Sequence, residues 1–274
     1  FTGSLHISGS RIALDDGKQN IAIGREALKV HTGIRNIAIG QNAMYDTDAG
    51  STSLTSRDNI FIGEETADGT WTNAASNFNI GIGNYIMNDA LDGALKNVGI
   101  GHGALSNLTT GDHNVAISPN SLTQLTTGNY NSVLGGYAGY AVTTTSNTVL
   151  IGYYAGYAIN SADADGTVAI GYQAGDAITD GAGNTAIGYQ ALSTVSTGDM
   201  NTAIGDGALK LVTGQYNVAV GYRALDSADG GESNNIGIGT NVMGHINHDD
   251  SDHNVAIGDS ALLGGTGTVT KNVA

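Results

Sequence analysis

The chain has 274 residues, with 42 Gly but only one Pro, one Trp and three Phe, and its formal net charge at pH 7 is −15. Hydrophobic residues make up 40 % and are mostly small aliphatics, which fits a thin, elongated core better than a compact one. The acidic balance argues against nucleic acid as a partner, no apolar run approaches the roughly 18 residues of a membrane span, and the lack of Cys excludes disulfides and thiolate metal sites.

The chain divides into two parts of unequal length. Residues 1–19 carry no repeat and are expected to form an N-terminal connecting segment; its first ten residues lack the basic and apolar regions of a signal peptide. Residues 20–274 are expected to form one repeat domain, which breaks off inside a fifteenth copy that opens at Asn272. The sequence is therefore expected to be an ordered piece of a longer fibre.

One short motif, Asn-aliphatic-small-Ile-Gly, organises the repeat domain. Fourteen copies begin at positions 20, 36, 59, 79, 97, 114, 131, 148, 167, 184, 201, 217, 235 and 254, at intervals of 16 to 23 residues and most often 17. This interval is too short for a supersecondary domain but suits one turn of a solenoid, here called a rung. The sequence therefore predicts an all-β, parallel β-solenoid (a β-roll) of about 14 short rungs, roughly 65 to 70 Å long at about 4.8 Å per rung.

The motif predicts a three-residue strand whose two faces differ. The fourth position is Ile, Leu or Val in every copy and the second is Ile or Val in eleven, so these two positions form an aliphatic stripe on one face. The third position is Ala, Gly or another apolar residue, where an outward strand face would be polar. We expect this small-residue face to be covered by another chain, since one thin solenoid has a single interior.

The remaining positions predict turns and a polar ladder. Gly at the fifth position marks a sharp turn, the Ala-Leu pair that follows forms a second short strand or a bend, and Thr-Gly segments form the return loop. Twelve copies open with Asn, which we interpret as a ladder of side-chain amides along the stack; an Asn that merely tolerates a turn is the alternative. These residues are Asn20, Asn36, Asn59, Asn79, Asn97, Asn114, Asn131, Asn184, Asn201, Asn217, Asn235 and Asn254.

The amino-acid sequence of the motif resembles known fibre repeats. Asn-x-Ala-Ile-Gly-x-x-Ala resembles the head repeats of trimeric autotransporter adhesins, and the segment 183–192, Gly-Asn-Thr-Ala-Ile-Gly-Tyr-Gln-Ala-Leu, is similar to repeats of phage tail-fibre proteins. The resemblance covers 20–274 and implies a left-handed parallel β-roll in which three chains share an axis and the aliphatics face inward. It therefore implies a homotrimer, although the rungs here are longer than that family's usual repeat of about fourteen residues.

Two kinds of polar segment are candidates for cation binding. The stretch 245–253 holds three His and three Asp, and His248, Asp250, Asp252 and His253 are the candidate ligands, because imidazole and carboxylate together suit a transition metal. The acidic segments 163–166 and 226–232 are candidates for Ca²⁺, although neither has the spacing of a known calcium loop. Solvated acidic loops are the alternative in each case.

Aromatic residues are the candidates for receptor contact. Tyrosines recur at equivalent places in adjoining rungs and would align into ladders, which either hold a sugar ring by its apolar face or extend the core outward. Trp71 lies in one of the three longest intervals between motifs (41–58, 64–78 and 240–253), where it either contacts a receptor or anchors its loop. The candidate contacts are Trp71, Tyr137, Tyr153, Tyr154, Tyr172 and Tyr189.

The sequence favours a structural and adhesive function over catalysis. A regular rod presents like residues in rows, whereas an enzyme needs unlike residues in one pocket, and no nucleophile, phosphate-loop or zinc motif occurs. We expect an extracellular virion appendage, the shaft or head of a tail fibre, that binds itself and a cell-surface glycan or protein receptor without inserting into a membrane. A bacterial surface adhesin or matrix filament is the first alternative, and an ice-binding solenoid is the second.

Overall fold

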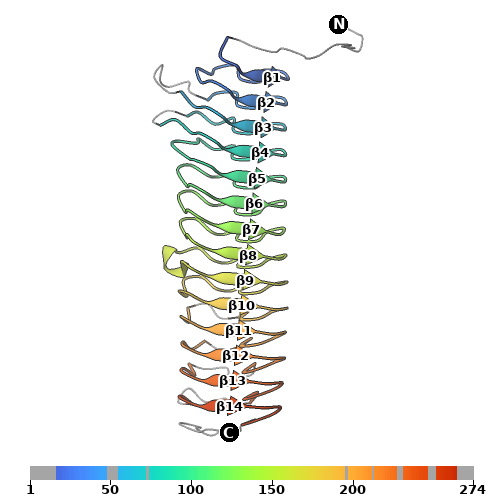
Figure 1. Cartoon of the computed structure of the whole chain (residues 1–274), viewed down its shortest axis with the longest axis vertical. Coiled ribbons are helices and arrows are strands. Elements are labelled where there is room, and N and C mark those ends of the chain that lie inside the picture. Colours follow the sequence, from blue (N-terminus) through green and yellow to red (C-terminus); the bar gives the residue numbers. More distant parts are fainter. Residues whose placement is uncertain are drawn as a thin grey trace, which may run out of the picture.

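The computed structural model describes residues 17–47, 55–71, 74–194, 197–211, 213–226, 231–245 and 251–263. These residues form a straight rod of stacked rungs, each containing one strand and a return path of turns (Figure 1). The predicted all-β parallel solenoid is confirmed. Nearly all of the predicted connecting segment (residues 1–16) and the start of the fifteenth repeat, Asn272, lie outside the described residues.

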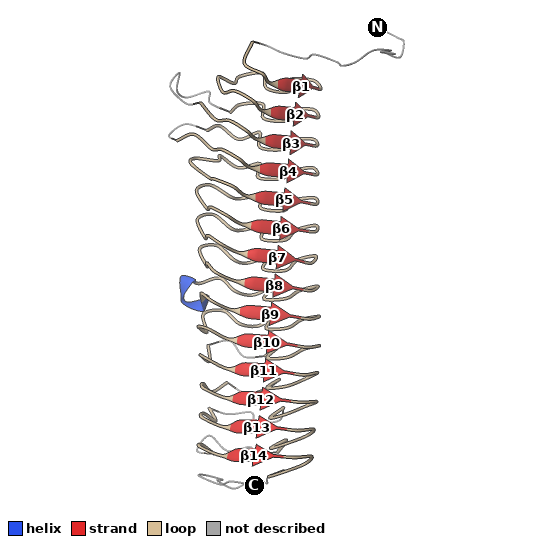
Figure 2. Cartoon of the chain, viewed as in Figure 1, coloured by secondary structure: helices blue, strands red, loops and turns tan. Residues whose placement is uncertain are grey.

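All fourteen strands belong to one parallel sheet, in which each strand pairs with the next one along the chain (Figure 2). Equivalent motif positions pair in register, as Ala186 does with Ala203. The one helical element among the described residues is a single 3₁₀ turn, η1 (Ala162–Ala164). The strands are β1 (Ile21–Ile23), β2 (Ile37–Ile39), β3 (Ile60–Ile62), β4 (Ile80–Ile82), β5 (Val98–Ile100), β6 (Val115–Ile117), β7 (Ser132–Leu134), β8 (Val149–Ile151), β9 (Val168–Ile170), β10 (Thr185–Ile187), β11 (Thr202–Ile204), β12 (Val218–Val220), β13 (Ile236–Ile238) and β14 (Val255–Ile257).

The interior of the rod takes the third motif position, which corrects the prediction that this small-residue face points outward toward another chain. Residues at the strand centre, such as Ala116 and Ala186, are fully buried in the core of their own chain. The rung is narrow, so a side chain pointing inward soon meets the opposite wall. Gly81 illustrates the limit, because a Cβ there would come within 2.5 Å of the Phe61 ring and 3.0 Å of Ile86. Small residues at this position therefore fit the width of a single chain.

The opposite wall of each rung is built from the Ala-Leu pair and a second aliphatic residue near the return loop. In the rung that begins at Asn97, Ala104, Leu105 and Leu108 are all fully buried. The pair forms a bend, not the second short strand that was the other expectation, and its amides still bond from rung to rung, as Leu105 N–H does to the Ser121 carbonyl at 3.1 Å.

The glycine that ends each strand is required by its conformation. Thirteen of the fourteen strands are followed by a Gly whose φ lies between 122° and 147°, and the fourteenth is followed by Ser118 at 121°. A Cβ at Gly171 would also collide with the carbonyl of Gly188 in the next rung. At this turn the backbones of neighbouring rungs are in direct contact, which leaves little room for a side chain.

Buried asparagines hydrogen-bond along the length of the rod. The twelve Asn at the first motif position are buried, and in each typical pair the Oδ1 of one rung accepts from the backbone N–H of the next. Asn114 N–H lies 2.9 Å from Asn97 Oδ1, and the Asn114 side-chain amide donates to the Gly128 carbonyl at 2.8 Å. Thr148 takes the same place with its hydroxyl, which donates to Asn131 Oδ1 at 2.7 Å. The ladder thus satisfies buried polar groups that a purely apolar core would leave unpaired.

Candidate functional site: the strand face and the tyrosine row

The outward surface of the sheet, here called the strand face, consists of the second and fourth motif positions of β1 to β14. Aliphatic side chains on it are exposed to solvent: Ile23 retains 49 % of its surface, Ile204 37 % and Ile257 62 %. The sequence pattern correctly paired these two positions, but in this chain they lie on the outside. The face that another molecule can cover is therefore the aliphatic one.

The strand face is long, straight and without charge. None of the fourteen described strands carries Asp, Glu, Lys or Arg at any position, and the fourteen rungs span roughly 65 Å at about 4.8 Å each. An aliphatic surface of this extent is unusual on a monomer in water, because burying it in a contact is favourable by about 25 cal/mol per Å².

Tyrosines form short stacks at the turn that follows the strands. The tyrosine row, defined as Tyr153, Tyr172 and Tyr189 at the sixth motif position, stacks with centroid separations of 6.1 and 5.3 Å and interplanar angles of 14° and 9°. Its members are about half exposed. The row is thus a ladder that also presents aromatic surface to solvent.

Two further stacks lie behind the tyrosine row. Tyr137 stacks on Tyr154 at 5.3 Å, and Tyr140 stacks on Tyr157 at 5.5 Å. Their rings are half-buried and pack edge to face against their neighbours. The pKa of Tyr153 is raised, chiefly by the hydrogen bond between its hydroxyl and that of Tyr154. Tyr137 and Tyr154 therefore extend the core outward more than they offer a contact surface.

Trp71 is fully buried and packs edge to face on Phe61, with ring centroids 6.5 Å apart. This burial supports the loop-anchor alternative for Trp71 over receptor contact. Gly81 leaves room for the Phe61 ring, and Trp71 packs against that ring, an arrangement that sequence spacing alone does not reveal.

The candidate metal ligands are only partly described. His248 and Asp250 lie outside the described residues, whereas Asp252 accepts a hydrogen bond from the Ser233 N–H at 2.6 Å and His253 N–H donates to the Ser233 carbonyl. Within the described ranges, no three His, Cys, Asp or Glu side chains gather closely enough to hold an ion. Metal binding here stays a prediction.

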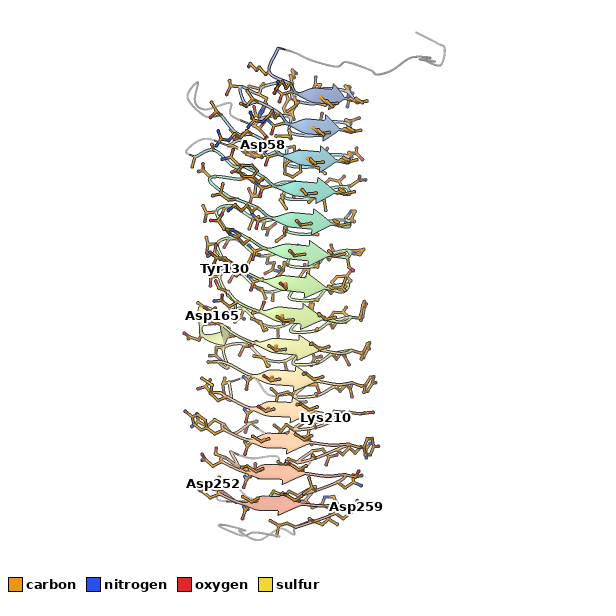
Figure 3. The ribbon with its side chains drawn as sticks, in the orientation of Figure 1. Asp58, Tyr130, Asp165, Lys210, Asp252 and Asp259 are labelled. Carbon is orange, nitrogen blue, oxygen red and sulfur yellow. The ribbon has the colours of Figure 1, made fainter. Side chains whose placement is uncertain are left out.

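The acidic segments proposed for Ca²⁺ have structural partners. Asp165 accepts from the Ser146 N–H at 2.7 Å, next to η1, and Asp226 lies 3.8 Å from Arg223. Asp165 and Asp252 lie along the same edge of the rod, several rungs apart (Figure 3). Asp165 and Asp252 each accept from a backbone amide of a neighbouring rung. Residues 227–230 lie outside the described part.

Sequence reasoning missed one feature of the tyrosine row. In the rung after Tyr189 the sixth position is Asp206. In the next rung it is again a tyrosine, Tyr222, which is 46 % exposed and continues the line of the tyrosine row. A cavity of about 460 Å³ opens at this interruption. Tabulating the sixth position of every rung would have exposed the gap, since the spacing of the Asn residues fixes the frame.

No protein-family model matches this sequence, and no curated protein is significantly similar to it. Among the residues described, no helix has the length and apolar character that a membrane crossing requires. Functional inference therefore depends on the strand face, the asparagine ladder and the tyrosine row.

Proposed function

We propose that the chain is a structural segment of an extracellular adhesive fibre, a shaft or head in which three copies pack together along their strand faces. The single observation that carries the proposal is the continuous, uncharged aliphatic strand face on the outside of β1 to β14. A second copy of the same chain is the occupant that matches it best, because it offers the same length, the same rung spacing and the same chemistry.

The rest of the rod supports a mechanical role. Backbone and asparagine hydrogen bonds run from each rung to the next, so a load along the axis is divided among several parallel bonds at every rung. The net charge of −15 keeps the remaining surface soluble. A phage tail fibre or similar virion appendage is the assembly we favour, from the resemblance of the repeats.

The mass of the protein in solution tests the proposal. Sedimentation equilibrium of residues 1–274 is expected to give about three times the chain mass of 27.7 kDa. A monomer at micromolar concentration would contradict it, because an aliphatic face of this size would then be left in water. A stable dimer would keep the self-packing of the strand face but overturn the threefold arrangement.

A further inference from the structure

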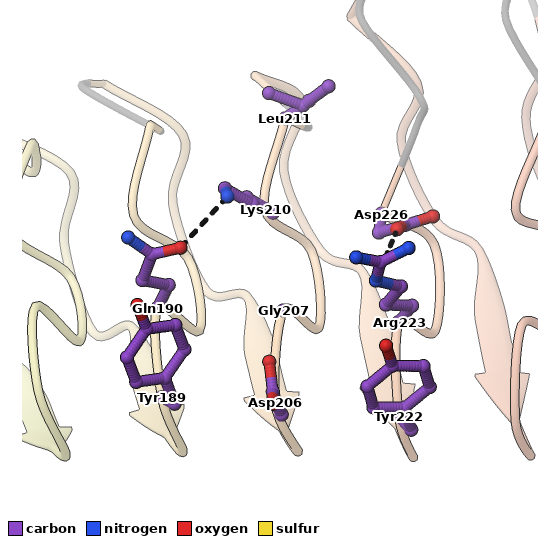
Figure 4. A pocket seen from close by; sticks show the side chains of 9 residues that line it. All are labelled: Tyr189, Gln190, Asp206, Gly207, Lys210, Leu211, Tyr222, Arg223 and Asp226. Carbon is purple, nitrogen blue, oxygen red and sulfur yellow. Dashed lines mark hydrogen bonds and ion pairs between the residues drawn. The ribbon is translucent and has the colours of Figure 1, made fainter.

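The tyrosine row is interrupted by one rung that lacks two side chains. The rungs on either side present Tyr189 with Gln190 and Tyr222 with Arg223 at the sixth and seventh motif positions. The rung between them presents the shorter Asp206 and then Gly207, which has no side chain. The result is a notch bounded by two exposed aromatic rings, with Asp206 between them (Figure 4).

The notch has the dimensions of one missing member of the stack. Tyr172 and Tyr189 in adjacent rungs have centroids 5.3 Å apart, and the rings of Tyr189 and Tyr222 are two rungs apart, or about 9.6 Å along the axis. A six-membered ring placed between them would lie about 5 Å from each. The cavity volume of about 460 Å³ accommodates one such ring and part of a second residue.

Polar groups around the notch are balanced in charge. Lys210 Nζ donates to Gln190 Oε1 at 2.9 Å, and the Arg223 guanidinium lies 3.8 Å from the Asp226 carboxylate. Two cations and two carboxylates thus line one cavity of a strongly acidic protein. This balance favours an uncharged ligand over an anionic one.

Asp206 is the polar group best placed to bond a ligand. It is exposed, and its carboxylate has no hydrogen-bond or ion-pair partner among the described residues. A carboxylate accepts from hydroxyl groups, and Lys210 can donate one of its remaining protons. A purely aromatic guest would stack on the tyrosines but would desolvate the Asp206 carboxylate without giving it a hydrogen-bond donor.

We propose that this notch binds one pyranose ring of an uncharged glycan, with its C–H faces stacked between Tyr189 and Tyr222 and its hydroxyls bonded to Asp206 and Lys210. A pyranose combines the two requirements, because its faces are apolar and its rim carries hydroxyls. The assignment rests on the proposed adhesive function and deepens it, since it names the receptor class and the rung that contacts it.

Saturation-transfer difference NMR with methyl glycosides of glucose, galactose, mannose and N-acetylglucosamine tests the assignment on the 1–274 protein. At least one of them is expected to receive saturation, strongest on the ring C–H protons. Tyr222→Ala is expected to weaken this binding by roughly tenfold. Asp206→Tyr, which completes the stack, is expected to abolish binding without loss of β-structure by circular dichroism.

Tyr216→Ala is the matched control, because Tyr216 is as exposed as Tyr189, at 52 %, but lies outside the notch. This variant is expected to bind the glycosides as well as the wild type does. The inference is overturned if none of the four glycosides binds, if Asp206→Tyr binds as well as the wild type, or if only a methyl sialoside or N-acetyltyrosinamide binds. Sedimentation equilibrium of the same samples measures their molar mass. A trimer that binds no glycoside would overturn this inference alone. A monomer that binds a glycoside would overturn only the proposed assembly.

Discussion

Asn97 donates twice to the same atom of the preceding rung: its backbone N–H and its side-chain amide each lie 3.0 Å from Asn79 Oδ1. The side-chain amide also donates to the Gly111 carbonyl at 2.8 Å. Asn97 Oδ1 in turn accepts two donors from Asn114. One amide side chain therefore links three successive rungs in a region from which water is excluded.

Asn97→Ala is expected to lower the free energy of unfolding by about 3 kcal/mol, because it leaves the buried Asn114 N–H and the Gly111 carbonyl without partners. Asn97→Thr is expected to cost about half as much, since Thr148 occupies the equivalent place and bonds to Asn131. Urea unfolding followed by circular dichroism measures both. Asn107→Ala, an exposed asparagine in the same rung, is the control and is expected to change stability by less than about 0.5 kcal/mol. Equal effects at Asn97 and Asn107 would contradict a stabilising ladder.

Ser118 is the one non-glycine residue after a strand, and its φ of 121° is strained for a residue with a Cβ. Ser118→Gly is therefore expected to raise the free energy of unfolding by about 1 kcal/mol, despite the extra freedom that glycine gives the unfolded chain. The midpoint of thermal unfolding, compared with the wild type, measures the change.

The reverse substitution provides the matched test of the same turn. Gly171→Ala is expected to destabilise by more than about 3 kcal/mol, because its Cβ would meet the Gly188 carbonyl. Gly231→Ala has open space around the added methyl group and is expected to be nearly neutral. A Gly171→Ala protein as stable as Gly231→Ala would show that the rungs can separate at this corner.

Burial raises the pKa of the Asp176 carboxyl to about 6, and its Oδ1 has no hydrogen-bond partner among the described residues. Backbone hydrogen bonds and the charge of Lys210 oppose the shift. Because the folded state holds the proton more tightly than the unfolded state, this group stabilises the fold below pH 4, and that contribution is lost as the pH rises through 6. Partial solvent screening limits it to about 1 kcal/mol.

Asp176→Asn is accordingly expected to be more stable than the wild type at pH 8 by about 1 kcal/mol, with no gain at pH 4. Thermal unfolding at intervals from pH 4 to 8 measures the difference between the two proteins, which removes the pH dependence they share. Asp163→Asn, at an exposed position within η1, is the control. A constant difference across this range would mean that Asp176 does not titrate there.

The spacing of the motif was sufficient to predict the fold, because every rung repeats the same strand and turn, and twelve of the fourteen open with a buried asparagine. It was not sufficient to predict which strand face points outward. Alternation places the Ile187 and Ala186 side chains on opposite faces of the strand whichever way the strand is turned. Only the width of the interior decides which of the two points inward. That width depends on the Ala-Leu wall across the rung, as at Ala191 and Leu192, whose burial is a tertiary property.

The notch illustrates a second limit of reasoning from a consensus. Attention to the residues that repeat, such as Tyr172 and Tyr189, passes over the rung that departs from them. Asp206 and Gly207 are unremarkable in sequence, and they become a site only because Tyr189 and Tyr222 lie on either side of them in the stack. Residues 33 positions apart in the chain are thus separated by only two rungs in space.

The outward strand face leads to the prediction that one charge on it disrupts assembly. Ile204→Asp places a carboxylate at the fourth motif position, the last residue of β11, where the side chain is already 37 % exposed, so the fold of each chain is expected to persist. In a trimer the substitution would bury a carboxylate in every copy close to two others, which costs several kcal/mol. Sedimentation equilibrium is expected to show monomers, with circular dichroism unchanged. Met200→Asp is the control, because Met200 is 54 % exposed and lies just before the same motif copy but outside the strand, and this variant is expected to keep the wild-type mass. If Ile204→Asp assembles as well as Met200→Asp does, the chains meet through some other surface.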